Sequence, residues 1–124
     1  MSQEFVLVSD LHSNYPALKK VVELEGRDKE YIVLGDIVGL LSYPKKTVEL
    51  VRSLSGFKLI GNHDKAIFHH GEGHVNADAL SRFELEHTLS SLSADDCEYM
   101  SNRPFMEVVQ RGPSRIALCH AYPW

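Results

Sequence analysis

With 124 residues, the chain is long enough for one domain, and an apolar fraction of 44% can supply its core. Its net charge of −4, with histidines neutral and no run of Lys and Arg, gives no general attraction to nucleic acid or to an anionic membrane. No apolar run approaches the roughly 20 residues that span a bilayer, and no signal-peptide pattern opens the chain. We therefore expect a single cytoplasmic domain over residues 1–124, with reduced cysteines and no membrane partner.

The first third of the chain predicts a strand, a helix and a second strand. Residues 4–9 are expected to form a strand whose apolar core, residues 5–8, is continuous, which is typical of a strand that is buried on both faces of its sheet. Asn14 is a candidate cap for a helix that opens at Pro16 and closes at Gly26. Residues 31–34 form the second strand, and the single helix between the two strands predicts that they pair in parallel.

The rest of the chain predicts further helices, a third strand and a hairpin. A helix that opens at Pro44 leads to the third strand, over residues 57–60. Later helices are expected over residues 65–70, 77–92 with Asn76 as its cap, and 93–101. Two strands about a Gly-Pro turn, over residues 105–109 and 116–119, complete the expected elements.

Polar side chains follow the ends of the expected strands, where ligands bind in open α/β sheets. They are Asp10 and His12, then Asp36, then Asn62, His63 and Asp64, and finally His120. Carboxylate, imidazole and amide ligands together suit Mn²⁺, Fe²⁺ or Zn²⁺. A carboxylate such as Asp36 can bridge two cations about 3.5–4 Å apart, and such a pair can bind phosphate and activate water. His63 could then protonate a leaving oxygen, with Asp64 orienting its ring.

Three of these stretches resemble the first three motifs of the calcineurin-like metallophosphoesterases, which are D-x-H, GD and GNHD in that order. They are residues 8–14, 34–39 and 61–64. Residues 119–123 are similar to an HG-S-P stretch in the small bacterial and archaeal phosphodiesterase branch of that family, with Ala121 in place of glycine. The resemblance covers essentially the whole chain.

The resemblance implies an α/β fold, in which two mixed sheets form an αββα sandwich flanked by helices. It implies that Asp10 and His12 hold a first metal, that Asp36 bridges, and that Asn62 and His120 hold a second. It also implies catalytic roles for His63 and for Asp64 behind it. The expected activity is hydrolysis of small phosphate mono- or diesters by a hydroxide that two divalent ions (Mn²⁺, Fe²⁺ or Zn²⁺) activate.

One departure limits this expectation, because the Gly-His-x-His motif that adds a histidine to each metal in the family is missing. The chain therefore resembles the N-terminal portion of the family domain, with the first sheet and its helices present and the second sheet largely missing. We expect that the exposed sheet is covered by self-association, by another chain or by a rearrangement of this one. The alternative function is a non-catalytic fragment that retains one metal weakly or serves as an interaction module.

A nuclease is a further alternative, because the family that the chain resembles includes such enzymes. The net negative charge of the chain argues against a nucleic-acid substrate.

The remaining histidines are expected to have other roles. We expect a structural role for His87 and a solvated loop at His69, His70 and His74, whose functional alternative is contact with substrate phosphate at the rim of a pocket. Tyr122 and Trp124 are expected to pack or fray at the terminus.

Overall fold

The expected strand–helix–strand unit opens the fold. The computed structural model describes residues 4–78 and 80–121, so the expectation for Tyr122 and Trp124 lies outside the described residues. Strand β1 (Phe5–Val8) leads through helix α1 (Tyr15–Glu25) to strand β2 (Glu30–Val33), and the two strands pair in parallel. Val8 lies opposite Val33, so both strands end at the same edge of the sheet.

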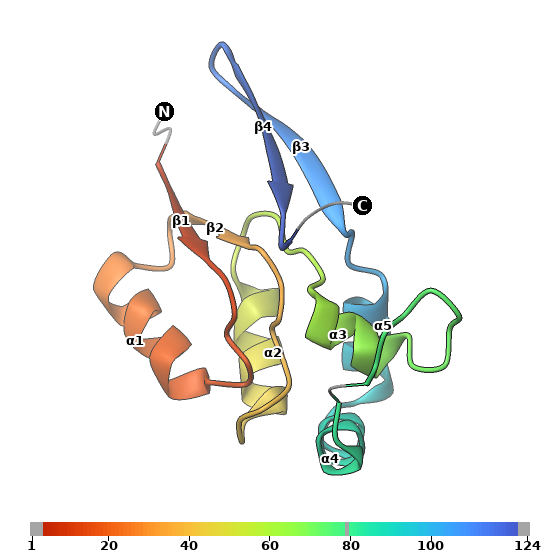
Figure 1. Ribbon diagram of the computed structural model, residues 1–124. Coiled ribbons are helices and arrows are strands. Elements are labelled where there is room, and N and C mark those ends of the chain that lie inside the picture. The colour runs from red at the N-terminus through yellow and green to blue at the C-terminus, as the bar shows by residue number, and fades with distance from the viewer. Residues whose placement is uncertain (1–3, 79, 122–124) are drawn as a thin grey trace.

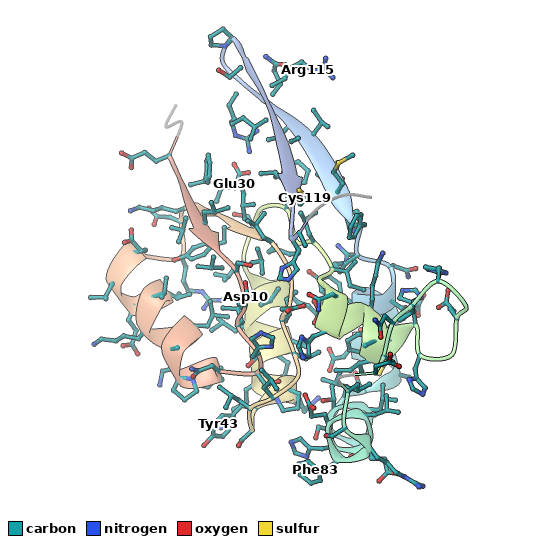
Figure 2. The ribbon with its side chains drawn as sticks, viewed as in Figure 1. Asp10, Glu30, Tyr43, Phe83, Arg115 and Cys119 are labelled. Carbon is teal, nitrogen blue, oxygen red and sulfur yellow. The ribbon has the colours of Figure 1, made fainter. Side chains whose placement is uncertain are left out.

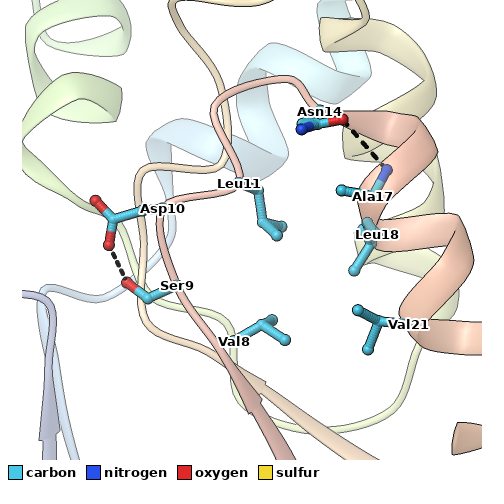
Figure 3. Close-up of a pocket in the computed structure, with 8 residues that line it drawn as sticks. All are labelled: Val8, Ser9, Asp10, Leu11, Asn14, Ala17, Leu18 and Val21. Atoms are coloured by element: carbon cyan, nitrogen blue, oxygen red, sulfur yellow. Dashed lines mark hydrogen bonds between the residues drawn. The ribbon is translucent and has the colours of Figure 1, made fainter.

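Local capping explains where the first two helices begin. The Asn14 side chain accepts a hydrogen bond from Ala17 N at 3.2 Å, which confirms the expected cap of α1 (Figure 3). Helix α2 (Pro44–Ser53) begins with Pro44, whose missing N–H costs nothing in the first turn. Helices α1 and α2 pack beside one another against the sheet (Figure 1).

The expected third strand is reduced to a single parallel bridge between Val33 and Lys58. Leu59 N donates to Val33 O at 2.8 Å, and Val33 N donates to Phe57 O at 2.9 Å. These two bonds hold residues 57–59 beside β2. The chain then turns at Gly61 directly into helix α3 (Asn62–Phe68), which begins three residues earlier than the sequence suggested.

Helix α4 (Arg82–Ser91) begins five residues later than expected, while α5 (Ala94–Ser101) agrees with the sequence. Asn76 does not cap a helix, because its side chain accepts from Asp78 N at 3.0 Å in a local turn. Ser81 caps α4 instead, in a reciprocal pair with Glu84. Phe83 of α4 is exposed (Figure 2) and its ring stacks on that of His87, whereas Thr88 is buried.

The hairpin of β3 (Met106–Arg111) and β4 (Ser114–Cys119) is confirmed as an antiparallel pair. It extends from one end of the molecule, away from the helices (Figure 1). Its Val109 and Leu118 pack on Ile32 and Leu59, over the opposite face of the first sheet from α1 and α2. The hairpin thus forms a second layer over part of the first sheet. This agrees with the expected sandwich, whose second sheet is only partly present in this chain.

Burial differs between the two strands of the first sheet. In β2, Tyr31 and Val33 face the helices and Ile32 faces the hairpin, and all three are fully buried. The expectation that the first strand is equally buried was wrong, because Leu7 in β1 is 54% exposed. The hairpin covers Ile32 but leaves its neighbour Leu7 open. Within the described ranges, no helix has the length and apolar character needed to cross a membrane.

Candidate metal centre

Three imidazoles converge on one carboxylate oxygen. His12 Nε2 lies 3.6 Å from Asp36 Oδ2, and both His63 Nδ1 and His120 Nε2 lie 3.3 Å from the same atom. The four residues come from four separate stretches of the chain, which the fold brings to the carboxyl end of β2 and its neighbours. The Asp36 side chain is 4% exposed, so its charge is held away from bulk solvent.

The remaining expected ligands border this cluster. Asp10 Oδ1 lies 3.6 Å from His12 Nε2, and Asn62 Oδ1 lies 3.0 Å from His120 Nε2. The Ser9 hydroxyl donates to Asp10 Oδ2 at 2.7 Å (Figure 3), and this bond is the main cause of a lowered pKa for Asp10. Asp10 lies near the middle of the molecule, below the end of β4 at Cys119 (Figure 2).

The loops that carry the first ligands have an unusual backbone. Asp10, His12 and Asp36 have φ angles of 57°, 47° and 54°, in the left-handed region that side chains seldom adopt. Backbone hydrogen bonds hold this conformation: His12 N donates to Asp36 O at 2.8 Å, and Asp10 N donates to Gly35 O at 3.0 Å. Strained backbone of this kind concentrates at functional sites, and nothing in the residue pattern signals it.

Two glycines allow the loops to approach each other. A Cβ on Gly35 would lie 2.5 Å from Gly61 N, and a Cβ on Gly61 would overlap the Asp36 backbone N and carboxylate. His63 N donates to Asp36 Oδ1 at 2.9 Å across this contact. Gly35 and Gly61 are therefore required because the two ligand-bearing turns touch.

Asp64 is fully buried and binds backbone rather than the His63 ring. Its carboxylate accepts from Ile37 N and Val38 N at 3.1 Å and from Gly61 N at 3.0 Å. Burial raises the pKa of Asp64 to about 6, although these three N–H groups favour the charged form. This geometry differs from the expected one, in which Asp64 orients His63. Its contacts instead join the start of α3 to the loop after Asp36.

The donor set fits divalent cations. Two groups place their ligand atoms within 4.8 Å of one another, namely His12, Asp36 and His63, and Asp10, Asp36 and His120. Asp36 belongs to both, which suits a bridging carboxylate. The ring atoms His12 Nδ1 and His63 Nδ1 are buried without a hydrogen-bond partner among the described residues. Of these two atoms, His63 Nδ1 lies 3.3 Å from the shared carboxylate of Asp36, and a buried, unpartnered nitrogen at that place favours a cation at the site.

Glu84 of α4 also borders the site, and the search for strand-end motifs missed it. Its Oε1 accepts from Leu40 N at 3.0 Å, and its Oε2 accepts from Ser81 N at 3.2 Å. Burial raises the pKa of Glu84, but these N–H groups and the nearby His63 outweigh it and hold the pKa below its usual value. The Ser-x-x-Glu capping signature at Ser81 could have drawn attention to it.

Comparison with known proteins identifies the family of the chain that carries this cluster. The sequence profile of the calcineurin-like phosphoesterases matches residues 4–123. The chain belongs to the calcineurin-like phosphoesterase family. The resemblance drawn from the strand-end motifs is thereby confirmed, as is the α/β metallophosphoesterase-like fold. Members of this family are hydrolases that act on phosphate esters and bind divalent metals.

Similar proteins come from bacteria and archaea. A metallophosphoesterase from Sphaerobacter thermophilus is 34% identical with a TM-score of 0.69, over 85% of this chain and 43% of that protein. PH1004 from Pyrococcus horikoshii is 26% identical with a TM-score of 0.68, over 91% of this chain and 52% of that one. MJ0912 from Methanocaldococcus jannaschii is 27% identical over 94% of this chain and 49% of that protein. The chain thus spans about half the length of these relatives.

Proposed function

We propose that this phosphoesterase-family chain hydrolyses small phosphate mono- or diesters with the help of two divalent metal ions. The convergence of His12, His63 and His120 on Asp36 Oδ2, at 3.3–3.6 Å, is the observation that carries the proposal. Small substrates suit the net charge of −4 better than a nucleic acid does. The free thiols Cys97 and Cys119 agree with a cytoplasmic location.

In this proposal Asp36 would be shared by the two ions. Asp10 and His12 would complete the ligands of one ion, and Asn62 and His120 would complete those of the other. When bound, divalent ions such as Mn²⁺, Fe²⁺ or Zn²⁺ neutralise phosphate charge and make a water molecule more acidic. With three protein ligands per site, each ion is held less tightly than with the further histidine that the family motif adds, so one of the two ions is the easier to lose.

His63 supplies the proton that the departing alcohol needs. Its Nδ1 faces Asp36 Oδ2 at 3.3 Å, which leaves Nε2 as the atom that donates to the leaving oxygen. His12 lies edge-on to the His63 ring, with centroids 4.9 Å apart, and limits its rotation. Asp64 acts indirectly, because the backbone that it fixes carries both Asp36 and His63.

Replacing Asp36 by Asn tests the proposal directly. The amide keeps the size of the side chain but removes the charge that two cations share, so we expect hydrolysis of bis-p-nitrophenyl phosphate with Mn²⁺ to fall at least about a hundredfold. Bound metal per chain, measured by mass spectrometry of the eluted protein, should fall in parallel.

Asp28→Asn is the matched control, because Asp28 is an exposed carboxylate between α1 and β2. It should keep both metal and turnover. Unchanged turnover in Asp36→Asn would refute the assignment of the centre.

A non-catalytic interaction module is the second candidate function. The exposed apolar side chains Leu7, Met106 and Val108 favour it, because they leave surface on which another chain could pack. Metal content separates the two candidates. Two ions held tightly per chain support the esterase, whereas one weakly held ion with no turnover on mono- or diesters supports the module.

A further inference from the structure

A cavity of about 240 Å³ opens beside two of the proposed metal ligands. Asn62 and His120 line it together with Lys65, His74 and Asn76, and the apolar residues Val75, Phe105 and Ala121 complete the lining. A smaller hollow borders Asn62, Asn76 and His63. Because the two spaces share Asn62 and Asn76, one bound molecule could extend from His63 into the larger cavity.

Lys65 places an uncompensated positive charge in this cavity. It lies on α3, three residues after Asn62, and its Nζ sits 4.0 Å from the centroid of the Phe105 ring. Within the part of the chain that the structure describes, no carboxylate lies within ion-pair distance of this ammonium. Lys29 and Lys45, by contrast, pair with Glu25 and Glu49. The aromatic face holds the ammonium in place and leaves its N–H groups available to a ligand.

The other polar groups of the cavity suit the same kind of ligand. His74 is exposed on the loop between α3 and α4, whereas Nε2 of His69 on the same loop lies 3.0 Å from Ser101 O. Asn76 supplies a side-chain amide next to it. An ammonium, an imidazole and an amide around one space form a donor-rich site for anionic oxygens.

We propose that this cavity holds the leaving group of the substrate and selects alcohols that carry a second negative charge, either a carboxylate or a further phosphate. Lys65 is the specificity-determining residue, with His74 and Asn76 beside it. This inference rests on the proposed function, because it takes the scissile phosphate to lie at the cluster around Asp36. The leaving oxygen then lies near His63 and the second anion near Lys65.

Substrates that differ only in the second charge test this inference. Glycerol 3-phosphate is compared with 3-phosphoglycerate for a carboxylate and with glycerol 1,3-bisphosphate for a phosphate. We expect Lys65→Gln to lower kcat/KM for one or both of the doubly charged substrates about tenfold, and for glycerol 3-phosphate less than about twofold. Glutamine has nearly the helix propensity of lysine, so α3 should remain folded. Lys20→Gln, which changes an exposed lysine of α1, should alter none of the three values.

A binding measurement separates this inference from the proposed function. Glycerate and glycerol are titrated into the Zn²⁺-treated protein, and the backbone amide signals of Lys65, His74 and Asn76 are followed by NMR. Glycerate should shift these signals, and the shift should weaken in Lys65→Gln. Equal shifts of these signals with glycerate and with glycerol would overturn the inference. So would an equal loss of kcat/KM on all three substrates in Lys65→Gln. Absence of turnover on every substrate would instead count against the esterase function, while the titration would still decide whether the cavity binds anions.

Discussion

The lack of a side chain at Gly61 allows the two ligand-bearing turns of the metal centre to touch. The space that a side chain would need is filled by the Asp36 backbone N and carboxylate. Gly61→Ala should therefore push the two ligand-bearing turns apart and lower the free energy of unfolding by about 2–4 kcal/mol. Urea denaturation measures this loss. Metal bound per chain should fall with it, because Asp36 would move away from His63.

Gly73→Ala is the control for Gly61→Ala. No atom lies within 4 Å of a Cβ at Gly73, and its φ is not in the left-handed region. Its free energy of unfolding should stay within about 0.5 kcal/mol of the parent value. A Gly61→Ala variant as stable as Gly73→Ala would contradict the role assigned to the contact.

The residues of the site were predictable from the sequence to a greater extent than their contacts. Polar groups after successive strands led to Asp10 and Asp36, because β1 and β2 are parallel and end at the same edge. His120 follows β4 of the antiparallel hairpin, so the resemblance to the family motif, and not parallel pairing, supported its place at the site. The same pattern could not assign the hydrogen-bond partners of Asp64, since its backbone donors Ile37 and Val38 are distant in sequence. Nor could it reveal Glu84, which reaches the site from a helix rather than from a strand end.

At the scale of elements, the start of α5 shows how a cap can also join two helices. Ser93 and Asp96 form the reciprocal cap, and Asp96 also accepts from Arg52 of α2 at 2.8 Å. Burial raises the pKa of Asp96, but Arg52 and Ser93 outweigh it and lower the pKa below its usual value. The charged carboxylate therefore stabilises the fold above its usual pKa, and this contribution is lost as the pH falls through the lowered value.

Asp96→Asn should consequently cost about 1–3 kcal/mol of unfolding free energy near pH 7 and less near pH 3. Urea denaturation of parent and variant at the two pH values measures the difference. Asp95→Asn removes the exposed partner of the same arginine and should cost less than about 0.5 kcal/mol. A cost for Asp96→Asn that does not shrink at low pH would show that the charge is not the stabilising group.

Helix boundaries were predictable where the capping residue is unique and not where two candidates compete. Asn14 and Ser93 each begin a helix as expected. Asn76 and Ser81 both precede the apolar pattern of α4, and only the pairing of Ser81 with Glu84 identifies the true start. The third strand was overestimated for a different reason, because the close contact at Gly61 ends its pairing after Leu59.

At the scale of the whole molecule, the hairpin covers only part of the first sheet. Met106 and Val108 project from one face of β3 and are 45% and 48% exposed, and Leu7 is open on the edge strand β1. A parallel sheet is normally covered on both faces. We propose that a second copy of the chain covers these side chains, and we expect the mass from sedimentation equilibrium to rise above 14.0 kDa with concentration.

Val108→Ser should weaken this association, because it removes apolar area from the exposed face of β3. Gln110→Ser changes the same exposed face without removing apolar surface, so it should leave the association as it is. A mass that stays at one chain over the whole concentration range would refute the self-association.

The hydrogen bonds between the ligand loops have a consequence for how the site can open. Asp10 N, His12 N and Ser13 N bond to three successive carbonyls, of Gly35, Asp36 and Ile37, so the pairing of β1 with β2 continues into the site. Local fluctuations normally free loops while the core stays closed. Here Asp10 and His12 can separate from Asp36 only when the backbone bonds beside β1 and β2 break as well. These three ligands therefore keep their relative positions for as long as the sheet survives.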